Sequence, residues 1–153
     1  MAPDPPLKLR AEDGADLAVI STVVQDALVS VNDLTYERDK RNFTLVANRF
    51  RWEAGDAGAE GANGAAPLER TLCAVSFGEV DSVSYRGFRR RDGERILSLL
   101  AVRPGDKRGT ILLQFSGGAT LRLTVSAIRV HATDIGEPWP TPWQPEHSVD
   151  DPP

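Results

Sequence analysis

The segment TILLQFSGGATLRLTVS, residues 110–126, constrains the fold more than any other part of the chain. From Leu121 to Val125 apolar residues alternate with threonine and arginine, which is the period of a strand with one buried and one wet face. Gly117-Gly118 can supply the positive φ angles that a two-residue turn needs. The segment therefore predicts an antiparallel hairpin.

Strand patterns continue on both sides of this hairpin, whereas one early segment has helical spacing. Leu17, Ile20, Val24 and Leu28 recur on one helical face, and Asp13 is a natural N-cap. Further strands are indicated at residues 7–11, 29–39, 42–52, 71–77, 80–88, 95–102 and 127–135. We predict an α+β fold: a mainly antiparallel sheet of about six to eight strands, a sandwich or partly closed barrel, with one N-terminal amphipathic helix packed on it.

The composition indicates one ordinary folded domain. The chain has 153 residues, of which 41% are hydrophobic and 26% charged, and a net charge of −4 that gives no general affinity for polyanions. We expect a flexible N-terminus at 1–6, a single domain at 7–136 with a flexible Gly/Ala-rich loop at 54–67, and a Pro-rich tail at 137–153. A single cysteine and the lack of any signal or membrane-spanning run predict a cytoplasmic protein.

The stretch VANRFRWE, residues 46–53, raises the first functional question. The alternation of apolar residues shifts by one position here, so we expect a bulge near Asn48–Arg49 that returns them all to one face. Arg49 and Arg51 would then point to solvent at a sheet rim. They serve there either as edge charges against aggregation or, with Trp52, as a binding surface. The binding alternative requires that they join the second basic group in one patch.

That second basic group is YRGFRRRDGER, residues 85–95, which contains five arginines and only two acidic residues. Tyr85 and Phe88 are interleaved with the arginines, as in a loop that contacts phosphates or RNA. The alternative is a solvated turn whose arginines pair with acidic side chains. In the tail, Trp139 either packs over an open end of the sheet or belongs to a ligand for a proline-recognising groove. The candidate binding residues are therefore Arg49, Arg51, Trp52, Arg86, Arg89, Arg90, Arg91 and Trp139.

Few residues offer catalytic chemistry. Cys73 and His131 could pair in space, but the apolar neighbours of Cys73 favour a small buried hydrophobe. Two histidines make a weak case for metal binding, and we expect no metal and no cofactor. Acid–base catalysis by paired carboxylates stays open as an alternative, with candidates Glu79, Asp81, Asp92 and Glu94.

Four stretches of the chain resemble a bacterial family known as domain of unknown function 2948. They are LKLRAEDGADLAVIS, VQDALVSVNDLTYERDKRNFTLVANRFRWE, ILSLLAV and DIGEPW, and the resemblance covers about residues 7–139. It implies a small cytoplasmic protein and supplies no activity or site residues.

The function we expect is that of a non-enzymatic module that binds a protein partner or a small ligand. We do not expect it to bind a membrane. One alternative is an RNA- or ribosome-associated factor that uses the arginine-rich loop at 86–95. Another is an enzyme with unrecognised carboxylate or histidine chemistry.

Overall fold

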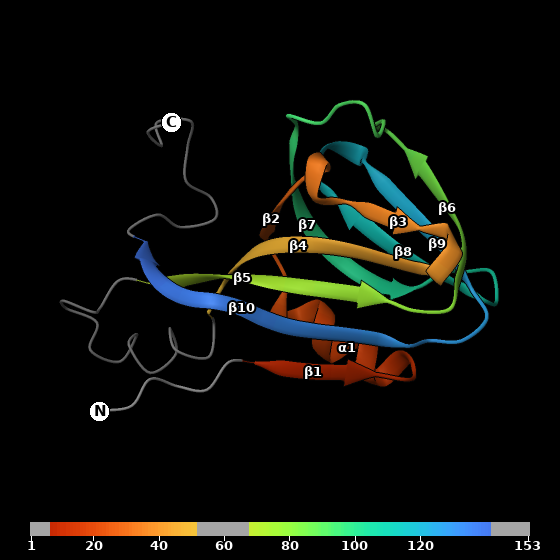
Figure 1. Ribbon diagram of the computed structural model, residues 1–153, viewed down its shortest axis with the longest axis horizontal. Coiled ribbons are helices and arrows are strands. Elements are labelled where there is room, and N and C mark those ends of the chain that lie inside the picture. The colour runs from red at the N-terminus through yellow and green to blue at the C-terminus, as the bar shows by residue number, and fades with distance from the viewer. Residues whose placement is uncertain (1–6, 52–67, 142–153) are drawn as a thin grey trace.

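The computed structural model describes residues 7–51 and 68–141, with Leu68 and residues 137–141 described by their backbone alone. The predicted α+β class is confirmed: one α-helix accompanies an open, antiparallel sheet (Figure 1). The elements are β1 (Lys8–Ala11), α1 (Gly14–Val23), β2 (Ala27–Ser30), β3 (Thr35–Glu37), β4 (Asn42–Phe50), β5 (Leu68–Phe77), β6 (Val80–Arg86), β7 (Ile96–Pro104), β8 (Thr110–Phe115), β9 (Thr120–Val125) and β10 (Val130–Thr141).

The sheet has ten strands in the described ranges, more than the six to eight predicted. Its order is β1-β10-β5-β4-β2-β7-β8-β9-β6, with β3 paired to β4 outside this path. The difference arises in part because one expected strand is divided: a 3-10 turn at Val31–Asp33 separates β2 from β3. The path has two ends, at β1 and β6, so the sheet does not close through these strands.

Helix α1 begins where the sequence predicts. Asp13 caps it by accepting a hydrogen bond from the amide of Asp16 at 2.8 Å. Leu17, Ile20 and Val24 are buried as expected. Leu28 is not: its side chain is 40% exposed in β2, where its neighbour Val29 takes the inward position. The helical pattern ends before Leu28 because the chain turns at Asp26, whose φ of 64° is left-handed.

The core lies on the inner face of the curled sheet. In Figure 1 the near layer carries β1, β10, β5 and β4, with β7, β8 and β9 behind it and α1 behind β10 and β1. Alternate residues of each strand enter the core, for example Ile111, Leu113 and Phe115 of β8. The hairpin predicted at 110–126 is confirmed, with Gly117 and Gly118 at φ 72° and 78°.

The bulge expected in β4 is absent, and this changes the direction of its arginines. The β4–β5 register is unbroken from Phe43 to Phe50, so Arg49 occupies the same inward phase as Leu45 and Ala47. Arg49 therefore points into the protein and not to solvent, because an uninterrupted strand keeps its two-residue period.

Strand β10 extends into the segment that the sequence suggested as a Pro-rich tail. β10 runs to Thr141, past the domain end expected at 136. The expected flexible segments at 1–6 and 54–67, and the tail from 142 onward, lie outside the described residues.

Candidate functional site: a cationic hollow on the outer face of the sheet

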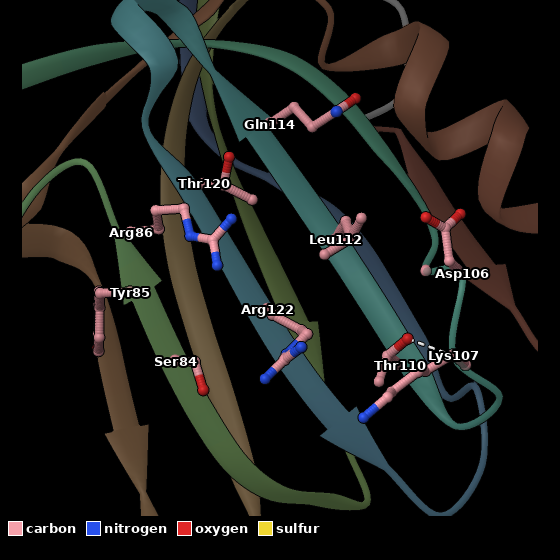
Figure 2. Close-up of a pocket in the computed structure, with 11 residues that line it drawn as sticks. Ser84, Tyr85, Arg86, Asp106, Lys107, Thr110, Leu112, Gln114, Thr120 and Arg122 are labelled. Carbon is pink, nitrogen blue, oxygen red and sulfur yellow. Dashed lines mark hydrogen bonds between the residues drawn. The ribbon is translucent and has the colours of Figure 1, made fainter.

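The outer face of β8, β9 and β6 contains a hollow of about 450 Å³ (Figure 2). Register places its side chains in rows across three neighbouring strands, because residues that pair directly project from the same face. Two such rows line it: Gln114, Thr120 and Arg86 form one, and Leu112, Arg122 and Ser84 form the other. The remaining lining residues are Tyr85 of β6, Thr110 of β8, and Gly105, Asp106 and Lys107 of the β7–β8 turn.

The alternating sequence of β9 creates the middle of this face. Leu121 and Leu123 are fully buried, so Arg122 between them must project outward. The turn before β8 brings Lys107 to the rim, where Thr110 Oγ1 donates a hydrogen bond to the Lys107 carbonyl at 2.5 Å. Gly105 permits this tight turn, since a Cβ there would lie 2.2 Å from Thr110 Oγ1.

The hollow is bordered by three cations, Arg86, Lys107 and Arg122. We call it the cationic hollow. Asp106 is the one acidic residue in the lining. Within residues 7–51 and 68–141, none of the three cations has an ion pair within 4.0 Å. An exposed guanidinium without a carboxylate partner keeps its donors available for a carboxylate or phosphate. The hollow is therefore chemically suited to an anionic ligand.

Arg41 provides a contrast on the same molecule. Its guanidinium contacts Asp81 at 2.7 Å and Glu79 at 3.3 Å, and it donates to Ser126 Oγ at 2.9 Å. These contacts raise the pKa of Arg41, chiefly through the hydrogen bond and charge of Asp81. Glu79 also contacts Arg129 at 3.3 Å. Two of the four carboxylates considered for acid–base chemistry, Glu79 and Asp81, thus contact arginines in a surface ion-pair network.

The arginine-rich loop extends from the end of β6, and its arginines lie at the surface. Arg89, Arg90 and Arg91 are exposed, and Asp92 accepts a hydrogen bond from the Arg89 amide at 3.0 Å. Arg89 and Arg91 line a second, more open hollow beside the first.

The two aromatic residues of this stretch pack against the core, Phe88 almost fully and Tyr85 in part. Phe88 is 5% exposed and packs edge-on between Tyr85 and Phe115, with ring centroids 5.3 and 5.9 Å away. Tyr85 is half-buried, and burial raises its pKa. The interleaving of aromatic and basic residues in the sequence therefore anchors the loop to the core.

The arginines of VANRFRWE are buried, which corrects the expectation that they point to solvent. Arg49 is 0% exposed and forms a two-point contact with Asp134 of β10, Nε to Oδ1 at 2.9 Å and Nη2 to Oδ2 at 2.7 Å. Its third nitrogen donates to the Phe50 carbonyl at 2.9 Å. Asp134 also accepts a hydrogen bond from the Leu7 amide at 3.1 Å, so this pair joins β4, β10 and the residue just before β1.

Two further arginines complete this end of the sheet, and together with Arg49 we call them the buried arginine cluster. Arg51 is 7% exposed and ion-paired with Glu69. Arg70 is 8% exposed, lies 4.0 Å above the Phe50 ring and donates to Asn48 Oδ1 at 2.5 Å. Trp52 lies outside the described residues; the Trp139 backbone pairs with Arg70, while its side chain is not described.

The two arginine groups do not form the single patch that the binding interpretation required. β4, which carries Arg49, and β6, which ends at Arg86, are separated in the sheet by β2, β7, β8 and β9. Of the candidates whose side chains the structure describes, only Arg86 lies in the cationic hollow. Arg122 and Lys107 were not among the candidates. The alternating sequence of β9 indicates that Arg122 faces solvent. No local sequence signal indicates that β6 pairs with β9 and so brings Arg86 beside it.

The candidates for nucleophilic chemistry and metal binding are placed apart. Cys73 is fully buried, as predicted, and burial raises the pKa of its thiol to about 12, so the thiolate nucleophile is scarce at neutral pH. His131 is exposed on β10. Among the described residues, no three histidine, cysteine or acidic side chains gather as a metal site would require.

Comparisons with known proteins identify a family. Neither a search of curated proteins nor a search of solved structures found a match. No helix in the described part of the chain has the length and apolar character needed to cross a membrane. A family model described as "Protein of unknown function (DUF2948)" matches residues 7–147, nearly the whole chain, and the protein therefore belongs to this family.

Proposed function

We propose that this protein is a binding module that holds an anionic ligand, through carboxylate or phosphate groups, in the cationic hollow. One observation carries the proposal: Arg86, Lys107 and Arg122 surround a concave surface without an ion pair in the described residues. The net charge of the chain is −4, so acidic partners for these cations are abundant elsewhere. Their separation from those partners favours a surface kept for binding.

The lining supports recognition of an anion from several directions. Arginine presents a planar fork of donors that matches two oxygens of a carboxylate or phosphate. Hydroxyls of Ser84 and Thr120 and the Gln114 amide add neutral hydrogen-bonding groups, and Leu112 adds an apolar surface. A few polar groups converging on a partly apolar surface are typical of ligand sites.

Two observations favour a protein or small ligand over RNA. RNA bases are commonly held by stacking on exposed aromatic rings. Phe88 is buried, and Tyr85 is half-buried against it. The loop arginines would then contribute phosphate contacts without the stacking that gives single-stranded RNA much of its affinity.

A titration of labelled protein with citrate and with pyrophosphate tests the proposal by NMR. We expect amide shifts confined to residues around Ser84, Thr120 and Arg122, and binding that weakens as salt is added. Arg86→Ala/Arg122→Ala should weaken the binding at least tenfold.

The matched control is Arg10→Ala, which removes an exposed arginine from β1 at the other end of the sheet path. It should bind like the wild type. Shifts scattered over the whole surface, or equal binding by the double variant, would contradict the proposal.

A further inference from the structure

The strand that borders the cationic hollow is also a free edge of the sheet. β6 is the last strand in the path, and in the described ranges its residues 82–86 pair with β9 alone. The other path end, β1, has four residues, two of them basic. β6 has seven residues and is the longer edge.

The middle of β6 lacks the features with which proteins usually protect an edge. Natural edge strands carry prolines, bulges or inward-pointing charges that prevent another strand from pairing. The register irregularity of β6 lies at its beginning, between Val80 and Ser82, and its one acidic residue, Asp81, is held by Arg41. From Ser82 to Tyr85 the strand has neither proline nor charge. Its backbone can therefore accept an added strand.

The two faces of this edge differ in chemistry. On the outer face Ser84 and Arg86 border the hollow, and Arg122 lies directly across from Ser84. On the inner face Val83 and Tyr85 are only partly buried and pack against the core. The apolar inner layer thus ends at β6 with surface left exposed, while the outer layer ends in positive charge.

We propose that the partner is an extended peptide in which acidic and apolar residues alternate, and that it adds to β6 as a further strand. This inference rests on the proposed function, since it uses the cationic hollow. Alternate side chains of a strand point to opposite faces. Acidic side chains of the peptide then lie over Arg86 and Arg122, and its apolar side chains cover Val83 and Tyr85. The backbone of β6 supplies the hydrogen bonds.

The geometry permits both arginines to take part. Neighbouring strands lie about 4.8 Å apart, so an added strand is next to Arg86 and two strand spacings from Arg122. Ser84 is small and stands between Arg122 and the edge, which leaves space for a long guanidinium side chain to meet a glutamate. Figure 2 shows Arg86 and Arg122 on the same side of the sheet, above β6 and β9.

A set of synthetic peptides tests the inference. The first is a capped heptapeptide with alternating glutamate and valine, and the second has the same composition in blocks. Two more are alternating peptides N-methylated on one or the other alternate set of nitrogens. Binding is measured by calorimetry, and amide exchange of β6 by NMR.

We expect the alternating peptide to bind at least tenfold more tightly than the block peptide and to slow exchange of β6 amides. An added strand turns one set of its nitrogens toward β6, so one N-methylated peptide should lose binding and the other keep it. Arg86→Ala/Arg122→Ala should weaken binding at least tenfold, whereas Arg10→Ala should not.

Four outcomes overturn the inference. The first is equal binding of all four peptides, and the second is slowed exchange at β1 in place of β6. In both cases the proposed anion site stands if citrate and pyrophosphate still bind in the hollow. Absence of binding by small anions and peptides alike removes the site itself. Binding of oligouridylate RNA in the hollow, without binding of the alternating peptide, replaces the peptide with nucleic acid.

Discussion

The protein uses arginine in two opposite ways in two regions of one sheet. In the buried arginine cluster, Arg49 has no exposed surface and both oxygens of Asp134 bind it. In the cationic hollow, Arg122 is exposed and has no ion pair among the described residues. Arginine therefore forms a fixed internal link between β4 and β10 in the buried cluster, and offers unused hydrogen-bond donors in the cationic hollow.

Neutralisation of the charge, and not the density of arginines, separates structural from binding positions. A buried guanidinium must have its charge and donors matched, since an unpaired buried charge is strongly destabilising. An exposed guanidinium is hydrated, so its lack of a partner costs little and leaves it free to bind. Variants in the two regions should consequently differ in which property they change.

Loss of Arg49 should have the largest effect on stability. Arg49→Ala leaves the buried Asp134 carboxylate without its partner, and breaking a buried pair in this way costs about 3–5 kcal/mol. Chemical denaturation measures the change in the free energy of unfolding. Arg49→Met/Asp134→Leu, which removes both charges, should be less destabilised than the single variant. A loss below about 1 kcal/mol in Arg49→Ala would show that the pair is not a structural link.

Much of the fold could be predicted from the sequence because local patterns specify it. Alternation and the Gly117-Gly118 turn identified the β8–β9 hairpin, and Asp13 marked the start of α1. The order of strands could not be predicted, because pairings such as β6 with β9 or β10 with β5 join segments far apart in the chain. Propensity and periodicity contain no information about such contacts.

The site was harder to predict for the same reason. Arg86 was a candidate, but Arg122 and Lys107 join it only through the pairing of β6, β9 and β8. Arg49 was misread because the shifted apolar alternation suggested a bulge that would turn it to solvent, whereas β4 continues without a bulge and keeps Arg49 in the inward phase. A buried arginine needs a partner such as Asp134, which lies 85 residues away in the sequence.

The buried region should also respond to alkaline pH through Cys73. Its pKa is raised from 9.0 to about 12 by burial, so the folded protein keeps the proton that the unfolded chain loses. Stability is then complete below pH 9 and falls above it by about 1.4 kcal/mol per pH unit until the pH approaches the folded pKa. Denaturation of wild type and Cys73→Ala between pH 8 and 10.5 measures the slopes. Equal slopes would contradict this assignment.

Loss of Arg122 should have the smallest effect on stability, and this makes it the sharpest test of the comparison. Arg122→Ala removes an exposed side chain without a partner in the described residues, so the free energy of unfolding should change by less than about 0.5 kcal/mol. A loss above about 1 kcal/mol would mean that Arg122 is structural. In that case the lack of an ion pair on an exposed arginine would no longer distinguish the cationic hollow from the buried arginine cluster.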